Sequence, residues 1–140
     1  MPFVFRTTAP LSGAPPATAT FDVKTLPGGS ELAVTVVPKT AGLSVAFLAP
    51  GDLAPARSNY PGIVQRGRWR ALYVALPADG VTWRASFKAG DAAALAKATA
   101  ILISPRFPGG SGWQSLPAWL PQEHAVWHAE AMWVLRAAGQ

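Results

Sequence analysis

The stretch of sequence that decides the fold is RWRALYVALPADGVTWRASFK, residues 68–88. Apolar and polar side chains alternate within it twice, before and after the turn-forming run Pro77-Ala78-Asp79-Gly80. Alternation of this kind is typical of a strand with one buried face, and a glycine at position 80 tolerates the positive φ of such a turn. The stretch therefore predicts two strands, 68–76 and 81–88, joined as a β-hairpin with one polar face.

Each of the two strands divides its side chains between two faces. In the first strand, one face carries Trp69, Ala71, Tyr73 and Ala75, and the other carries Arg68, Arg70, Leu72, Val74 and Leu76. In the second, the inward residues are Val81, Trp83, Ala85 and Phe87, and the outward ones are Thr82, Arg84, Ser86 and Lys88. The aromatic side chains of both strands are thus expected to contribute to one core.

Further strands are expected on both sides of this stretch. They are predicted at residues 19–24, 31–37, 43–48 and 99–103, from alternation or from runs of β-branched residues. Residues 91–97 can form one or two helical turns with Asp91 as N-cap, and residues 49–67 are expected to be loop. The sequence predicts an all-β fold, an antiparallel β-sandwich of about seven or eight strands with one short helix.

Composition supports a folded β-rich domain. The chain has 140 residues, of which 50% are hydrophobic and 14% charged, so it can bury a core and is too apolar to be disordered. Its 14 Pro and 13 Gly exclude long helices. Residues 1–18, which hold all but the last residue of the Pro-rich run TAPLSGAPPATA (8–19), are predicted to be a loose N-terminal arm or linker, and residues 19–140 a single β-sandwich domain.

The cellular compartment is not decided by the residues alone. The chain has no cysteine, which excludes disulfides but fits both periplasmic and cytosolic proteins. No apolar run reaches the roughly 18 residues of a membrane span, and the start MPFVFRTTAP lacks the pattern of a signal peptide. The chain is either cytosolic or a piece of a larger exported protein.

Positive charge is concentrated in the middle of the chain. Between residues 57 and 88 there are six basic residues and one acidic residue, Asp79. The basic residues are Arg57, Arg66, Arg68, Arg70, Arg84 and Lys88. One interpretation is an anion-binding patch for nucleic acid, phospholipid or a cell-wall polymer. The favoured interpretation is that these side chains occupy the solvent faces of strands, with their stems covering apolar surface.

The segment 112–135, GWQSLPAWLPQEHAVWHAEAMWVL, holds four of the six tryptophans and both histidines. Residues 122–138, which begin within this segment, fit a helix that starts near Pro121, and their alanine content favours this. The same residues alternate as a strand would, with Trp133 and Leu135 on one face and Met132 and Val134 on the other. The residues leave helix and strand equally supported.

Motifs for catalysis or metal binding do not emerge from the sequence. His124 and His128 have helical spacing, but their order with the neighbouring glutamates is not that of a zinc peptidase, and in a strand their rings would lie about 13 Å apart. The run Gly109-Gly110-Ser111-Gly112-Trp113 lacks the last glycine of a nucleophile elbow. We expect no catalytic residue, no metal and no cofactor.

Two loop tryptophans are the candidate ligand residues. Trp113 and Trp119, near Arg106, can stack on a sugar ring or enter a partner's pocket. The alternative is that both rings fold back and close the core, because several prolines restrain this loop and large exposed aromatic side chains are costly in a monomer.

A family resemblance adds to these observations. GRWRALYVALPADGVTWRASF (67–87), followed by the tryptophan-rich segment, resembles the C-terminal β-domain of bacterial membrane-anchored M28-family zinc metallopeptidases. The similarity covers about residues 60–135 and lies in the turn Leu76–Gly80 and the Leu116–Pro121 loop. No position of this chain matches the family's zinc ligands or catalytic glutamate, so no catalytic residue is carried over.

The resemblance implies that residues 122–138 form a closing strand and that the protein is periplasmic or extracytoplasmic. It also implies a non-catalytic accessory or interaction domain of a membrane-anchored metallopeptidase, whose partner is the parent peptidase domain or an envelope component. The alternative function is a carbohydrate- or cell-wall-binding module that uses the loop tryptophans. Neither function requires nucleic acid, and no membrane span is expected in this chain.

Overall fold

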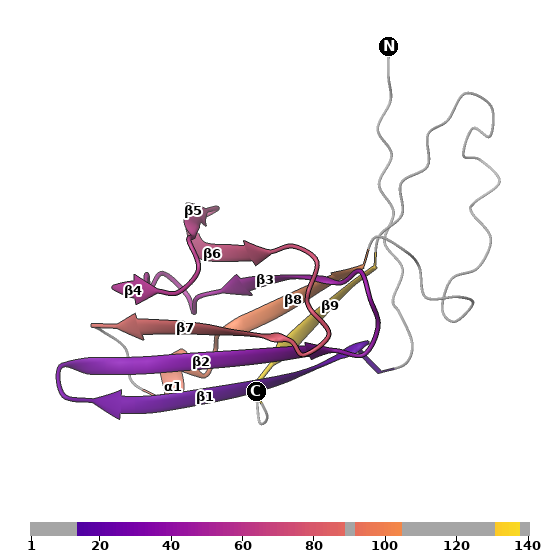
Figure 1. The fold of residues 1–140 in the computed structure, drawn as a ribbon. Helices are drawn as coiled ribbons and strands as arrows, with labels where there is room; N and C mark the ends of the chain where they lie inside the picture. The colour runs from indigo at the N-terminus through magenta and orange to yellow at the C-terminus, as the bar shows by residue number, and fades with distance from the viewer. Residues whose placement is uncertain (1–13, 89–91, 105–130, 138–140) are drawn as a thin grey trace, which may run out of the picture.

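The computed structural model describes residues 14–88, 92–104 and 131–137. The described part contains nine strands and one short helix in chain order (Figure 1). The strands are β1 (Ala17–Leu26), β2 (Gly29–Pro38), β3 (Ser44–Leu48), β4 (Arg57–Ser58), β5 (Ile63–Gln65), β6 (Arg68–Tyr73), β7 (Val81–Phe87), β8 (Thr99–Ser104) and β9 (Ala131–Arg136). The helix α1 (Ala92–Leu95) follows β7 and precedes β8 in the chain, and it contacts β1.

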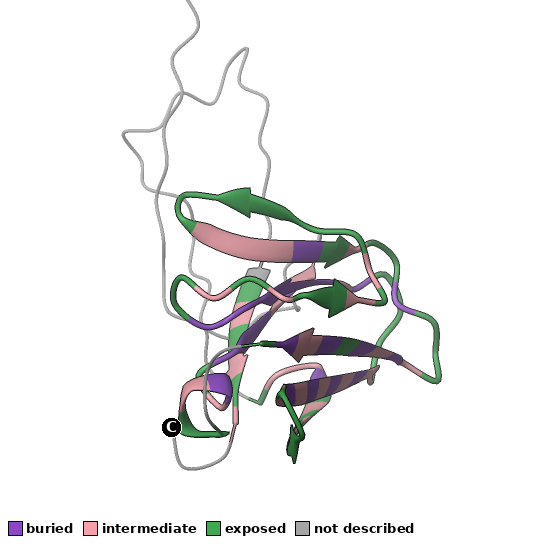
Figure 2. Ribbon diagram, turned by 90° about the vertical axis from the view of Figure 1, so that its left-hand side faces the viewer, coloured by how far each residue is buried: buried purple, intermediate pink, exposed green. Residues whose placement is uncertain are grey.

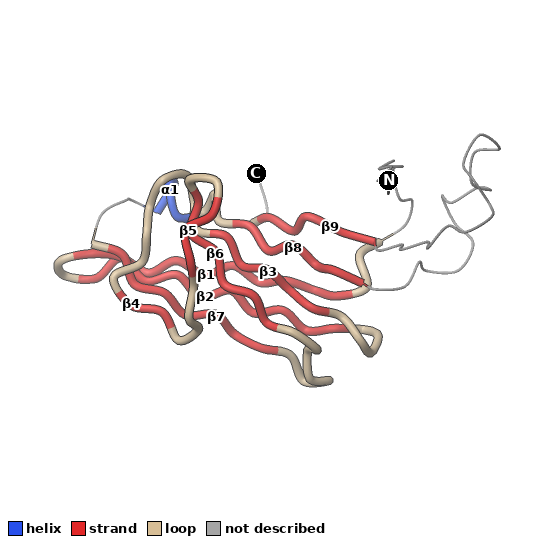
Figure 3. The backbone as a smooth tube through the Cα atoms, turned by 90° about the horizontal axis from the view of Figure 1, so that it is seen from above, coloured by secondary structure: helices blue, strands red, loops and turns tan. Residues whose placement is uncertain are grey.

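The strands form two antiparallel sheets that pack as two layers (Figures 1 and 3). One sheet has the order β1-β2-β7-β4, and the other has the order β5-β6-β3-β8-β9. The prediction of an all-β sandwich with one short helix is confirmed. Every pairing between neighbours in the two sheets is antiparallel, as expected for strands that each bury one face.

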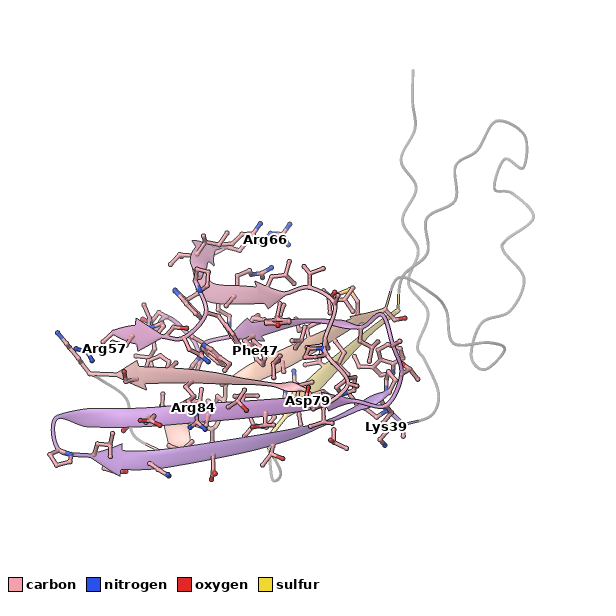
Figure 4. All side chains as sticks on the ribbon, in the orientation of Figure 1. Lys39, Phe47, Arg57, Arg66, Asp79 and Arg84 are labelled. Atoms are coloured by element: carbon pink, nitrogen blue, oxygen red, sulfur yellow. The ribbon has the colours of Figure 1, made fainter. Side chains whose placement is uncertain are left out.

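The core fills the space between the sheets. Alternate residues of β2 and β7 are buried, because successive side chains of a strand point to opposite faces (Figure 2). The largest fully buried side chains are Trp83, Phe47, Leu32, Leu43, Leu95, Leu102, Val34, Val36 and Val45. Phe47 lies at the centre, stacked on Trp83 with ring centroids 5.4 Å apart, and Figure 4 shows it between the layers.

The predicted hairpin between residues 68 and 88 is wrong. β6 pairs with β3 and β5, whereas β7 pairs with β2 and β4, so the two strands belong to different sheets. The turn exists, since the amide of Gly80 donates to the carbonyl of Pro77 at 2.9 Å. However, the seven residues 74–80 carry the chain from one layer to the other. Alternation shows which face of a strand is buried, but it does not identify the strand beside it.

The crossover also changes two residues at the end of β6. The strand ends at Tyr73, and Ala75 has a φ of 60°, which breaks the alternation. Leu76 is therefore buried and Ala75 exposed, the reverse of their predicted faces. The amide of Leu76 donates to the carbonyl of Leu43 at 2.7 Å, so the crossover is fastened to the segment just before β3.

Three other expectations can be compared with the structure. Residues 49–67, predicted as loop, contain the short strands β4 and β5. Residues 131–136 form a strand, so the strand alternative is correct for that part of 122–138. Trp133 and Leu135 pack against the core, while Met132 and Val134 lie on the opposite face.

Candidate interaction surface

The outer face of the four-stranded sheet is polar, and its side chains contact one another. Threonines and charged residues line it, and a hydrogen bond of 2.9 Å joins the hydroxyls of Thr35 and Thr82. Arg84 Nη1 lies 3.9 Å from Glu31 Oε1 in a largely exposed ion pair. Such a pair contributes little to stability, and this face has the mixed charge of an ordinary solvated surface.

The outer face of the five-stranded sheet is apolar. Its side chains come from four strands, and we call them the aliphatic face: Ile63, Leu72, Ile101, Ile103, Met132 and Val134. Four of them are half exposed or more, at 63% for Ile63, 58% for Leu72, 51% for Met132 and 50% for Val134. Ile101 and Ile103 are partly buried between their neighbours. A contiguous apolar sheet face of this kind is typical of an interaction surface.

The strand register gathers these residues. Leu72 pairs with Ala46, Ala46 with Ile101, and Ile101 with Val134, so one apolar row crosses four strands. Paired residues of neighbouring antiparallel strands lie on the same face of a sheet. The next row on the same face includes Ile103 opposite Met132. The apolar surface is therefore a consequence of the register and not of one irregular loop.

An arginine cluster lies at one end of the aliphatic face, made of Arg68, Arg70 and Arg136. Arg70 pairs with Leu48, Leu48 with Thr99, and Thr99 with Arg136, so two of the arginines share a row of the sheet. Arg68 is anchored beside them. Its Nε donates to the carbonyl of Ala49 at 2.6 Å and its Nη2 to the hydroxyl of Thr99 at 3.3 Å.

The arginine cluster has no acidic partner among the described residues. Of the described carboxylates, those of Asp22 and Glu31 are on the four-stranded sheet, and those of Asp52 and Asp79 are in loops. Partial burial lowers the pKa of Arg68, and the charges of Arg70 and Arg136 lower this pKa further. Arg68 is therefore repelled by both Arg70 and Arg136, which makes this end of the sheet a favourable place for an anion.

A shallow depression adjoins both features. It has a volume of about 450 Å³ and is lined by residues that include Ala46, Pro61, Ile63, Arg70, Leu72 and Ile103. The Nε of Arg70 is buried and has no hydrogen-bond partner within the described part of the chain. The depression is open to solvent along the sheet, so it is a hollow in the aliphatic face and not an enclosed ligand cavity.

The sequence-predicted site residues are not among the residues that the structure describes. Trp113, Trp119 and Arg106 fall outside the described residues, as do His124 and His128. The glycan-binding alternative, which depends on the tryptophans, therefore stays a prediction. In residues 14–88, 92–104 and 131–137, no three His, Asp or Glu side chains come together as candidate metal ligands.

The six basic residues of the 57–88 region do not form one patch. Arg57 and Arg84 belong to the four-stranded sheet, whereas Arg68 and Arg70 are on the five-stranded sheet. Figure 4 shows Arg57 and Arg66 well separated at the edges of the molecule. Four of the six residues are on strands, as the favoured interpretation expected, whereas Arg66 is in the turn before β6 and Lys88 follows β7. The meeting of Arg68 and Arg70 with Arg136 was not predicted.

One signal in the sequence pointed to the aliphatic face. Residues 72 and 74, 101 and 103, and 132 and 134 are all apolar, although their alternating neighbours already supply the core. A strand that is apolar on both faces in an antiparallel sheet indicates that something covers the second face. Only the register shows that three such strands contribute to a single surface.

Comparison with known proteins gives no family assignment. No protein-family model matches the chain, and no curated protein matches it. Of the helices in the described ranges, none is long and apolar enough to cross a membrane.

Proposed function

We propose that this chain is a non-catalytic interaction domain that uses the aliphatic face to meet a component of the cell envelope. The observation that supports it is the contrast between the two outer faces of the sandwich. The outer face of the four-stranded sheet is polar, and its side chains form a hydrogen bond and an ion pair with one another. The outer face of the five-stranded sheet exposes Ile63, Leu72, Met132 and Val134. Covering each half-exposed aliphatic side chain contributes about 1 kcal/mol to the free energy of binding. A partner that covers all four therefore gains several kcal/mol of binding free energy.

The parent complex that we propose is a membrane-anchored M28-family metallopeptidase, with this domain as its accessory part outside the cytoplasm. The resemblance of residues 67–87 and of the segment that ends in β9 supports this proposal. The genomic sequence upstream of Met1 tests it. A zinc peptidase domain followed by hydrophobic spans is expected there, and a locus that encodes neither contradicts the link to a peptidase.

Met132 offers a direct test of the interaction face. It is one of only two methionines in the chain, and its side chain is 51% exposed on the aliphatic face. Hydrogen peroxide oxidises an exposed thioether, and mass spectrometry follows the reaction. The purified chain is oxidised with and without envelope membranes of the source cells, with N-acetylmethionine added to correct for peroxide consumption.

We expect the membranes to slow the oxidation of Met132 several-fold. The double variant Leu72→Thr with Val134→Thr is the control, because it removes apolar contact from the same face while leaving Met132 in place. In this variant the protection is expected to be lost. Equal oxidation rates of the wild-type chain with and without membranes would mean that the aliphatic face stays uncovered, and the proposed function would then be rejected.

A further inference from the structure

The aliphatic face and the arginine cluster are continuous, and together they have the chemistry of a lipid-binding surface. We propose that they bind an anionic lipid bilayer surface, with the sheet lying against the headgroup region and Arg136 reaching the headgroup phosphates. This inference rests on the proposed function, because it names the envelope component that the aliphatic face meets.

The kind of side chain on the face favours lipid over a protein partner. Energetically important residues of protein interfaces are enriched in Trp, Tyr and Arg that fill pockets, and Leu and Val are under-represented among them. Here the exposed residues are Ile63, Leu72, Met132 and Val134, and the depression beside them is shallow. Acyl chains and glycerol backbones conform to such a surface without a matching shape, as they do beneath amphipathic helices at membranes.

The placement of charge favours an anionic bilayer over a neutral one. None of the described carboxylates belongs to a strand of the five-stranded sheet, so among the described residues the charges on that sheet are all positive. Arg136 is exposed at the end of β9, in the same row of the sheet as Arg70. Guanidinium groups pair with phosphate oxygens through two parallel hydrogen bonds, and a basic residue near an anionic leaflet gains roughly fivefold in membrane affinity.

Vesicle binding tests the inference. The purified chain is sedimented with vesicles of phosphatidylcholine alone, and with vesicles of phosphatidylcholine mixed with phosphatidylglycerol. Oxidation of Met132 is measured in the same samples to show which face is covered. We expect binding to the mixed vesicles, protection of Met132 by them, weaker binding at high salt because charges are screened, and little binding to the neutral vesicles.

Two matched pairs of variants locate the contact. Arg136→Glu is compared with Arg57→Glu, which makes the same change of charge at an exposed position of the four-stranded sheet. We expect Arg136→Glu to weaken binding on the order of tenfold, since attraction is replaced by repulsion, and Arg57→Glu to weaken it much less. Leu72→Thr is compared with Leu26→Thr, because Leu26 is also exposed but lies at the end of β1.

The outcomes separate this inference from the proposed function. Equal loss in Arg136→Glu and Arg57→Glu, or equal binding to neutral and anionic vesicles, overturns the assignment of the anionic lipid site. If vesicles leave Met132 unprotected while source membranes protect it, the partner is an envelope protein; the lipid inference is then wrong and the proposed function stands. If neither protects Met132, both fail. Circular dichroism of each variant confirms that the fold is retained.

Discussion

The indole rings of Trp69 and Trp83 stack across the interior of the sandwich, with centroids 5.6 Å apart and planes 12° from parallel. The two residues come from different sheets, so the stack joins the layers. Trp83 also donates from its indole nitrogen to the hydroxyl of Ser58 at 3.0 Å, which holds the short strand β4 in place. Stacked aromatic pairs of this kind contribute about 0.5–1.5 kcal/mol beyond the area that they bury.

Gly62 is required by the position of Trp69. A β-carbon at residue 62 would run into the indole of Trp69 and lie 2.7 Å from the carbonyl oxygen of Arg70. We expect Gly62→Ala to lower the free energy of unfolding by about 1–3 kcal/mol, as overpacking does in other cores. Urea unfolding followed by circular dichroism measures the change.

A second variant identifies the cause of that loss. Adding Gly62→Ala to a Trp69→Leu background should cost less than adding it to the wild type, because the smaller side chain leaves part of the required space. The difference between the two costs is the coupling energy of the pair. Identical costs in the two backgrounds would show that Trp69 is not the obstacle.

The sequence predicted the burial of these residues but not their pairing. Alternation in 81–87 identified the buried Val81, Trp83, Ala85 and Phe87 correctly, because burial of one strand face is a local property. Strand pairing is not local. A seven-residue connection permits either a return beside the first strand or a crossing to the other layer, and the choice depends on β2 and β3, which come earlier in the chain.

The same distinction applies to the candidate site. Leu72, Ile101 and Val134 are far apart in sequence, and each is unremarkable as a single exposed or half-buried aliphatic residue. They become one surface through three pairings in the register of the five-stranded sheet. The arginine cluster is likewise a result of register. The alternation placed Arg68 and Arg70 on one strand face, but it did not show that Arg136 lies beside them.

Tyr60 gives the protein an alkaline pH dependence. Partial burial of the phenol, followed by the effect of the neighbouring Tyr73, raises the pKa of Tyr60 above the ordinary value of 10.0. At pH values between the pKa of Tyr60 in the unfolded state and its pKa in the folded state, the folded state binds more protons than the unfolded state. The free energy of unfolding therefore falls as pH rises through this range. The stabilisation is therefore complete below about pH 10 and is lost as the pH rises above that value.

Absorbance of tyrosinate measures this titration, since Tyr60 and Tyr73 are the only tyrosines in the chain. Tyr60→Phe should remove the component with the raised pKa and flatten the dependence of stability on pH above 10. A variant whose stability still falls as steeply as that of the wild type would assign the effect to another group.

The turn between β5 and β6 contains a correctable strain. Arg66 and Gly67 both have positive φ, 54° and 74°, which is the geometry of a type I′ two-residue hairpin turn. Arginine rarely adopts this conformation, whereas asparagine followed by glycine is the favoured pair. We expect Arg66→Asn to raise the free energy of unfolding by about 0.5–1 kcal/mol.

Arg66→Gln is the matched control for the turn, because it removes the same charge without the preference for positive φ. It should leave stability within about 0.5 kcal/mol of the wild type. If both variants are stabilised equally, the gain comes from removing a positive charge and not from the turn.

The arginines of the cluster are expected to differ in what they contribute to the fold. Arg68 donates to the carbonyl of Ala49 and to the hydroxyl of Thr99, so Arg68→Met should lower the free energy of unfolding by about 1.5–3 kcal/mol. Arg136 is exposed and repels Arg68. Arg136→Gln should therefore leave stability unchanged or raise it slightly.

Salt separates repulsion from other effects of the Arg136→Gln change. Since screening weakens the repulsion between guanidinium groups, added salt should stabilise the wild-type protein more than the Arg136→Gln variant. Urea unfolding at low and high salt measures this difference. A loss of stability in Arg136→Gln at both salt concentrations would mean that Arg136 supports the fold. A gain confined to low salt would mean that this charge is held near Arg68 at a cost in stability, as expected of a group that binds an anion.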